Sequence, residues 1–537
     1  MKRLAALLIV LDIVSYSAAP AGAELLKNFH MSGQIDLQTT NANNITDFAT
    51  GPNPSTTYPG IGTTAPCGAG GCANNDRISD VQTRVMLNMD WDLLDDVHAK
   101  VGIVKNDRAW GTAGGNSFTD GQSQPLLSPT AATNDGVANN IYVNQASFKV
   151  DKVAGQFDLT MGRQNYGDPN DVVIYFGPSE KASYDLPYNA IDAARVDWGG
   201  SESLAITSLA GVLKNAGVGT APQSDSNLFG IDFTAKSGET AKGSLYLWNK
   251  VTHNTGASGA PPTDTPSAGG KNDNLFVTGF KGKVAGGGFW LKGEFDQDFG
   301  DNRVLLAANM PDTSGENAAD SHYEGFATMG DAGYKAEDDN IGMISFWAQS
   351  AMGSGRQNTQ SNHNDGWVPI NSDYRPGSIY GRFSSSGLLG SNIPLVGNNA
   401  NNAIGGGLSN RVIWGGGIKV SPAAANKFQL ALSYWDFRLH RFTDTPVPNN
   451  ANGTNNNFAD GGNSHIGSEF DVDVTWTHSE NVSFGAGWAT FQPGGAIYNA
   501  VANANAASAT TNAPGPNTPS QGVNPANLTY FDVRLKF

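Results

Sequence analysis

The chain has 537 residues, of which 66 are glycine, and charged residues make up only 15% of it. Its formal net charge of -16 excludes a nucleic-acid-binding protein, which needs a basic face. Its mean hydropathy of -0.33 excludes a bundle of membrane helices, because each such helix needs a run of about 20 apolar residues. Several soluble domains and one large closed sheet remain as fold classes.

The N-terminus has the pattern of a signal peptide. The basic pair Lys2-Arg3 precedes the apolar stretch Leu4–Val14, and the small residues Ala21-Gly22-Ala23 follow it. We expect cleavage after Ala23, so that residues 1–23 form the signal peptide and residues 24–537 a single domain. The apolar stretch is too short to remain as a membrane span. A helix of the protein core is the alternative.

The chain contains two cysteines, Cys67 and Cys72, which lie close together in a glycine-rich segment. Because an exported chain meets oxidising conditions, this pair predicts a disulfide that closes a small loop. A metal-binding pair is the alternative, although no histidine lies in this segment. The sequence has no C-x-x-C-H motif, so we expect no covalently attached haem.

Runs of alternating apolar and polar residues recur along the chain. Such alternation over about ten residues predicts a β-strand with one apolar and one polar face. The runs at His322–Tyr334 and Asn340–Met352 alternate poorly, so sixteen strands are an alternative to eighteen. The eighteen runs are Phe29–Gln38, Val81–Leu93, Val97–Asp107, Asn140–Val150, Gln156–Gln164, Ile191–Trp198, Leu204–Leu213, Asn227–Ala235, Ala241–Val251, Asn274–Val284, Phe289–Gly300, His322–Tyr334, Asn340–Met352, Asn410–Val420, Asn426–His440, His465–His478, Val482–Phe491 and Asn527–Phe537.

The connections between these runs are short turns and long segments in alternation. Lys236–Thr240 and Ser479–Asn481 are short turns, whereas Gly353–Ser409 and Gln492–Ala526 are the longest Gly-, Asn- and Ser-rich segments. Short periplasmic turns and long extracellular loops are typical of bacterial outer-membrane barrels. The sequence therefore predicts an all-β fold, a transmembrane antiparallel β-barrel of about 18 strands. A soluble multi-sandwich protein or a β-propeller is the rival fold.

Two further features agree with an integral protein of a bacterial outer membrane. The last predicted strand ends on Phe537, which is typical of proteins recognised by the barrel assembly machinery. This machinery and outer-membrane lipid are therefore expected partners. Aromatic residues near strand ends fit the girdles at the two membrane interfaces. They are Trp91, Trp110, Trp198, Trp248, Tyr434, Trp476 and Trp488.

Several strands resemble those of alginate-export-type outer-membrane porins. The resemblance implies an eighteen-stranded, monomeric barrel with a polar conduit. It does not determine the solute, because the alginate conduit is rich in arginine and the inward charges predicted here are mixed. The segments that carry the resemblance are Arg84–Asp90, Gly162–Gln164, Asp192–Val196, Ile466–Asp473, Val482–Phe491 and Pro493-Gly494.

The alternation also predicts which charged residues line the pore. The runs Trp290–Asp298 and Glu469–Asp473 place acidic rows on the inner face, and we expect Lys281 and Lys283 to lie beside the first row. Such rows set ion or solute preference, or they pair across strands and stiffen the wall. The candidates are Arg84, Asp90, Lys100, Arg195, Asp197, Lys281, Lys283, Lys292, Glu294, Asp296, Asp298, Arg411, Lys419, Glu469, Asp471, Asp473, Asp532 and Arg534.

A barrel of this size needs an infolded loop to narrow its channel. The longest candidate is Gly353–Ser409, whose apolar pieces Leu388-Leu389 and Ile393–Val396 suit packing into the barrel mouth. Binding of a partner by these apolar pieces is the alternative. The polar candidates in this constriction loop are Arg356, His363, Asp365, Arg375, Tyr380 and Arg382.

No catalytic motif or metal-binding motif is present, so we expect neither an enzyme nor a cofactor. The loop residues Asp331, Asp460 and Asn463 leave a structural Ca²⁺ ion open. The first hypothesis for function is a porin for passive transport of hydrophilic solutes or ions. A polysaccharide export channel is an alternative, and so is a barrel that surrounds a multihaem cytochrome as an electron conduit.

Overall fold

The structure is a computed structural model that describes residues 27–45, 48, 78–105, 141–179, 184, 186–201, 203–214, 225–253, 272–302, 321–355, 363–384, 389, 407–441, 464–498 and 524–537. The signal peptide, Cys67, Cys72, Arg356 and the apolar piece Ile393–Val396 lie outside the described residues. The sequence-based expectations for them therefore stay predictions.

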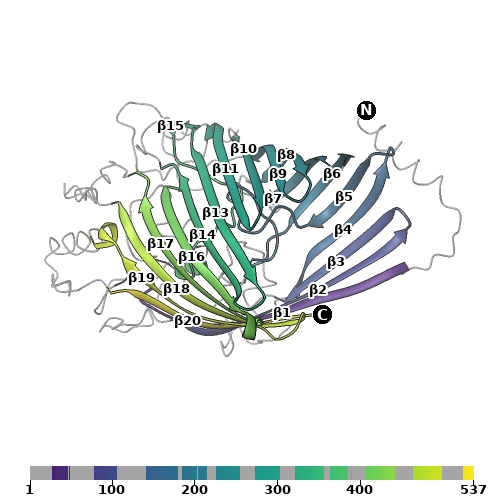
Figure 1. Cartoon of the computed structure of the whole chain (residues 1–537). Coiled ribbons are helices and arrows are strands. Elements are labelled where there is room, and N and C mark those ends of the chain that lie inside the picture. The colour runs from purple at the N-terminus through teal and green to yellow at the C-terminus, as the bar shows by residue number, and fades with distance from the viewer. Residues whose placement is uncertain are drawn as a thin grey trace, which may run out of the picture.

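Eighteen long strands of the described residues form the wall of a closed antiparallel barrel and follow one another around it in chain order (Figure 1). Strand β1 pairs with β2 on one side and with β20 on the other, which closes the wall. The predicted fold class and the count of eighteen are confirmed. The strands are β1 (Lys27–Asn43), β2 (Ile78–Leu94), β3 (Val97–Lys105), β4 (Ile141–Val153), β5 (Phe157–Gln164), β6 (Ile191–Ser201), β7 (Leu204–Lys214), β8 (Ser226–Ser237), β9 (Ala241–Thr252), β10 (Asp273–Gly286), β11 (Phe289–Asn302), β13 (Phe326–Asp338), β14 (Gly342–Gly353), β16 (Arg411–Pro422), β17 (Phe428–Leu439), β18 (His465–Thr477), β19 (Val482–Pro493) and β20 (Ala526–Lys536).

Four short elements accompany the wall: β12 (Ser321–Tyr323), β15 (His363–Asn364), helix α2 (Ile379–Ser384) and the 3-10 turn η2 (Ala423–Ala425). None of the helices in the described parts of the chain is long and apolar enough to cross a membrane.

The predicted strand His322–Tyr334 is divided in the structure into β12 and β13, and Gly325 lies at the break. The backbone of a neighbouring connection passes close to it, because a Cβ built at Gly325 would lie 2.4 Å from the carbonyl oxygen of Gly366. The interruption thus makes room for a chain segment that enters the barrel.

The two faces of the wall differ in chemistry, as the alternation predicts. In β10 and β11 the side chains of Phe280, Leu291 and Phe295 are exposed on the outer face, whereas those of Lys281 and Glu294 point to the inside. A continuous exposed apolar face needs an apolar surrounding, which lipid supplies.

Aromatic side chains gather on the outer face near the short turns of β17 to β20. Trp476 stacks on Phe428 at 5.7 Å and on Phe484 at 5.1 Å between ring centroids. This arrangement matches an interfacial girdle. The prediction for Trp248 is wrong: its side chain is 1% exposed, lies on the inner face and packs edge-on against Tyr166.

The inner face differs between the two ends of the barrel. Towards the long loops the inward side chains of Trp248 in β9 and Leu275 in β10 are buried. Towards the short turns the inward Lys242 and Lys283 of the same two strands are exposed. The inner face is therefore covered by packed groups in its long-loop half and accessible to water in its short-turn half.

Candidate functional site in the barrel lumen

Two chain segments fold into the barrel from its long-loop end. Segment 165–190, described at residues 165–179, 184 and 186–190, connects β5 to β6, and segment 363–389, described at residues 363–384 and 389, belongs to the connection between β14 and β16. They pair with each other: the N–H of Tyr175 donates to the carbonyl oxygen of Asn371 at 2.8 Å, and the N–H of Asn371 donates to that of Val173 at 3.0 Å. Residues 367–384 of the predicted constriction loop thus lie inside the barrel beside segment 165–190, whereas His363 and Asn364 form β15 and pair with β12.

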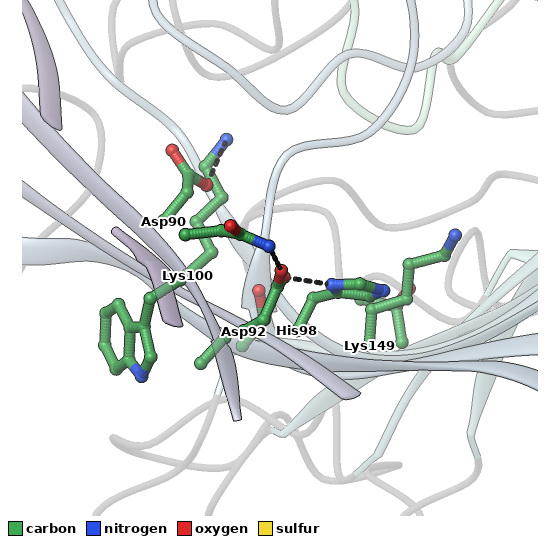
Figure 2. A pocket seen from close by; sticks show the side chains of 10 residues that line it. Asp90, Asp92, His98, Lys100 and Lys149 are labelled. Carbon is green, nitrogen blue, oxygen red and sulfur yellow. Dashed lines mark hydrogen bonds and ion pairs between the residues drawn. The ribbon is translucent and has the colours of Figure 1, made fainter. Parts of the chain in front are cut away.

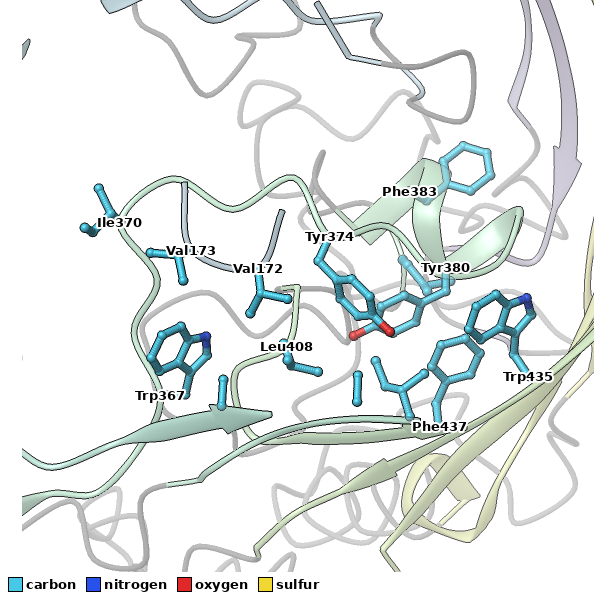
Figure 3. Close-up of a cluster of buried hydrophobic side chains, with 14 of the residues drawn as sticks. Val172, Val173, Trp367, Ile370, Tyr374, Tyr380, Phe383, Leu408, Trp435 and Phe437 are labelled. Atoms are coloured by element: carbon cyan, nitrogen blue, oxygen red, sulfur yellow. The ribbon is translucent and has the colours of Figure 1, made fainter. Parts of the chain in front are cut away.

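Apolar side chains hold these two segments together (Figure 3). Val173 and Ile370 belong to one buried cluster with Tyr374, Tyr380 and the wall residue Phe437. The rings of Tyr380 and Phe437 stack at 4.3 Å. Burial raises the pKa of the Tyr374 phenol well above its usual value, so this buried group stays uncharged. The segments and the inner face of the wall thus share one apolar core.

Asp171 fixes the turn at which segment 165–190 crosses the lumen. Its Oδ1 accepts the N–H groups of Val173 at 2.8 Å and Ile174 at 2.9 Å, which is the geometry that aspartate favours in turns. Its Oδ2 lies 2.7 Å from Nζ of Lys281 in β10. The predicted pore-lining residue Lys281 thus holds a loop in place across the lumen.

The acidic row of β11 is covered by the inward segments. Asp298 is 1% exposed, and its Oδ2 accepts the N–H of Val368 at 2.7 Å. Glu294 and Asp296 are buried as well, and both accept the hydroxyl of Tyr246. These three predicted pore-lining acids hold chain segments or other wall residues and do not face open water.

The acidic row of β18 makes similar contacts. Glu469 is fully buried, and its carboxylate accepts the N–H groups of Ile379 at 2.5 Å and Tyr380 at 3.0 Å at the start of α2. Asp471, also buried, accepts the hydroxyl of Ser433 at 2.9 Å. The third member, Asp473, accepts the hydroxyl of Tyr530.

Arg84 fastens segment 165–190 to the wall. Its side chain is 0% exposed, and Nη2 lies 2.8 Å from Oδ2 of Asp36 in β1. Nη1 donates to the carbonyl oxygen of Leu186 at 3.0 Å, and Nη2 donates to that of Ser179 at 2.9 Å. Asp36 also pairs with Arg534 at 2.6 Å. One carboxylate on β1 therefore holds two arginines in position.

Arg382 of α2 fastens the second segment to the same part of the wall, through residues of β20 and β1. Its Nη2 lies 3.4 Å from Oδ2 of Asp532, and Nη1 donates to the hydroxyl of Thr40 at 3.2 Å. The guanidinium also lies over the ring of Tyr530 at 4.6 Å, a cation–π contact. Both inward segments are thus tied to β20, β1 and β2 by buried arginines.

The remaining constriction candidates lie in two places. Arg375 is inside the barrel, where Nε lies 2.7 Å from Oδ1 of Asp373. His363 is near the long-loop end, 2.7 Å from Glu324, and Asp365 pairs with Arg441 at 2.6 Å. The structure therefore does not bring all members of the predicted set together.

The other pore-lining candidates lie on the inner face as follows. Arg195 pairs with Asp197 at 2.7 Å in β6. Arg411 donates to the carbonyl oxygen of Asn410 at 3.0 Å, and Lys419 is exposed between β14 and β17. Lys283, expected beside the acidic row, stands opposite Lys292 and Lys242.

The placement of Asp331 in a loop, where a structural Ca²⁺ ion was left open, is wrong. Asp331 lies within β13 directly opposite Lys292, whose Nζ is 3.5 Å from its Oδ2. Asp460 and Asn463 lie outside the described residues. Among the residues that the structure describes, no group of three or more His, Cys, Asp or Glu side chains is placed to hold a metal ion.

A pocket of about 320 Å³ lies on the inner face of β2 to β5 near the short turns (Figure 2). His98 lines this pocket, with Nδ1 2.5 Å from Asp92 and Nε2 3.0 Å from Asp151. Lys149 continues the network through Asp151 at 2.7 Å and Asp158 at 2.8 Å. The pair Lys100 and Asp90, 3.8 Å apart, borders the same pocket.

Sequence reasoning missed Asp36, Asp171, the network around His98, and the whole of segment 165–190. The alternation in β3 and β4 contains the signal for His98 and Lys149, since both occupy inward positions. The apolar run Val172–Phe176 inside a predicted extracellular loop was a further signal, because a loop in water does not need it.

No protein-family model matches the chain, and no curated protein matches it. Among solved structures, the chain is similar to OccK8 (OprE) of Pseudomonas aeruginosa at 9% identity, over 96% of this chain and 99% of that chain, with a TM-score of 0.46. It is similar to OccAB2 of Acinetobacter baumannii at 8% identity, over 96% and 98% of the two chains, with a TM-score of 0.48. A third such structure, OpdK of Pseudomonas aeruginosa with vanillate, has 11% identity over 95% and 99% of the chains and a TM-score of 0.44.

Proposed function

We propose that the protein is an outer-membrane porin that forms a water-filled channel for passive transport of hydrophilic solutes or ions. The observation that carries this proposal is the lumen itself. The barrel is apolar outside, its inner face is polar and exposed in the short-turn half, and two packed segments narrow the long-loop half. An infolded segment in a wide barrel is the device that makes a channel selective.

The same segments argue against a barrel that surrounds a multihaem cytochrome. Segments 165–190 and 363–389 occupy lumen space that such a partner would need, and buried contacts of Arg84 and Arg382 tie them to the wall. The proposal of passive transport needs no haem partner.

The resemblance to alginate-export-type porins bears on the solute only as a further proposal. Its strand segments lie in β2, β5, β6, β18 and β19. Since the described inner face carries both acids and bases, the proposed channel is not restricted to that polysaccharide. Export to the outer membrane with cleavage of the N-terminal signal peptide, and assembly through the terminal Phe537, are parts of the same proposal.

Planar bilayer recording with the purified protein tests the proposal. We expect discrete, stable current steps without any added partner. Current steps absent at every protein concentration, or haem absorbance that co-purifies with the barrel, would contradict a passive channel. Variants that loosen the inward segments should conduct more than the unchanged chain, whereas a barrel whose segments do not narrow the channel would give equal conductance.

A further inference from the structure

Four lysines stand in one row across four neighbouring strands at the short-turn end of the lumen. Lys236 of β8 is the direct partner of Lys242 in β9, Lys242 is the partner of Lys283 in β10, and Lys283 is the partner of Lys292 in β11. These four residues are here called the lysine row. Because neighbouring strands are about 4.8 Å apart, the row extends over roughly 14 Å.

The lysine row points into the lumen and is exposed. Lys281, two residues before Lys283, binds Asp171 of an inward segment, so Lys283 shares that inner face. All four side chains are exposed, in contrast to the buried inward residues further along the same strands. A solute that enters the short-turn half therefore meets the four ammonium groups.

The charge of the row is only partly compensated by the described protein, where Asp232 of β8 interacts electrostatically with Lys242 from beyond ion-pair distance. Lys292 lies 3.5 Å from Asp331. Within the described parts of the chain, no carboxylate lies within ion-pair distance of Lys236, Lys242 or Lys283. Like charges directly opposite each other on neighbouring strands destabilise a sheet. A row of three such pairs therefore costs free energy in the empty barrel, and a bound anion would remove that cost.

We propose that the lysine row is a binding site for a soluble ligand with two or more carboxylate or phosphate groups. The inference rests on the proposed channel function and names a solute class for it. Lysine ammonium groups act as flexible point charges with three donors each, unlike the planar fork of arginine. The row therefore selects by the number of negative charges on the ligand and by their spread, and a trivalent anion binds more tightly than a monovalent one.

Isothermal titration of the folded barrel in detergent with citrate, and with acetate as the monovalent comparison, tests the site without requiring conduction. We expect citrate to bind the unchanged protein and acetate to bind far more weakly. The double variant Lys242→Gln/Lys283→Gln should bind citrate about tenfold more weakly, since each exposed ion pair contributes a few tenths to 1 kcal/mol.

The matched control is Lys100→Gln/Lys149→Gln, which removes the same charge from inward lysines that have acidic partners. Equal weakening in both double variants, or no weakening in either, would overturn the proposal. Arginine at positions 242 and 283 should restore most of the affinity, and failure to do so would also contradict a site selected by charge. A barrel that binds citrate at the row but carries no current would refute the channel function while leaving the site intact.

Discussion

Two regions of the same inner wall use the same residue types in opposite ways. In the pocket of β2 to β5, Lys149 lies between Asp151 and Asp158, and His98 lies between Asp92 and Asp151. In the lysine row of β8 to β11, bases stand opposite bases. The first arrangement stiffens the wall because its charges neutralise one another. The second leaves its charge available to a solute, so the cross-strand register decides which role a lysine has.

The buried ion pair of Arg84 and Asp36 is a third kind of charged contact on the inner wall. Its removal should have the largest effect on stability. Replacing Arg84 by alanine leaves three loop carbonyls without their buried donor, and Asp36 keeps only Arg534 as an ion-pair partner. We expect a loss of about 3–5 kcal/mol in the free energy of unfolding, which is typical when one member of a buried ion pair is removed. Urea unfolding in detergent measures it.

The control is Lys100→Ala, which breaks an exposed pair and should cost less than about 1 kcal/mol. If both variants unfold at the same urea concentration, the buried arginine does not hold segment 165–190 in the way described. The Arg84→Ala barrel should also conduct more current, because that segment loses its attachment to β2.

The next largest effect concerns a carboxylate that binds a segment. In Glu469→Ala, the N–H groups of Ile379 and Tyr380 lose their acceptor inside a buried site. We expect about 1–3 kcal/mol of destabilisation, the cost of buried donors without a partner. Asp158→Ala, in the exposed pocket network, is the comparison and should change the unfolding midpoint by less. An equal change of the unfolding midpoint in both variants would show that α2 does not depend on the Glu469 carboxylate.

A smaller effect is expected on ion selectivity, to which the lysine row should contribute. Lys242→Gln/Lys283→Gln should shift the cation-to-anion permeability ratio towards cations by about two- to tenfold, from a few tenths to 1 kcal/mol per exposed charge. The reversal potential in a salt gradient measures this ratio. Arginine at both positions keeps the charge and should leave the ratio unchanged. A similar shift in the arginine variant would mean that side-chain shape, rather than charge, sets the selectivity.

The smallest expected effect is a change in the free energy of unfolding that has opposite signs in the two regions. Lys283→Gln removes repulsion between neighbours in the row and should raise the free energy of unfolding by a few tenths of a kcal/mol. Lys149→Gln removes a base held by two carboxylates and should lower it by a similar amount. Lys283 is exposed and Lys149 is partly exposed, so solvent screens the interactions of both. If both variants change the free energy of unfolding in the same direction in low salt, the lysines of the two regions do not have opposite roles.

Much of the wall follows from the sequence because alternation is a local property. The run Val81–Leu93 predicts a strand and the faces of its residues without knowledge of its neighbours, and β2 has that arrangement. The break between β12 and β13 could not be predicted in this way. It depends on Gly366, which comes close to Gly325 only after a distant connection enters the barrel.

The candidate site depends more strongly on contacts between distant residues. The inward positions of Glu294 and Glu469 follow from period two, but their burial under chain segments does not. Lys281 meets Asp171 across 110 residues of sequence, and Arg84 meets Leu186 across 102. No periodicity within a strand encodes such pairs.

By itself, the sequence determined the fold class, narrowed the number of strands to eighteen or sixteen and indicated the face on which most strand residues lie, because side-chain direction repeats every two residues along a strand. Only the tertiary structure decided which charges stand opposite each other and which loops enter the lumen. Strand register and loop packing are set by contacts between distant parts of the chain, and a shift of the register would give each lysine of the row a different partner.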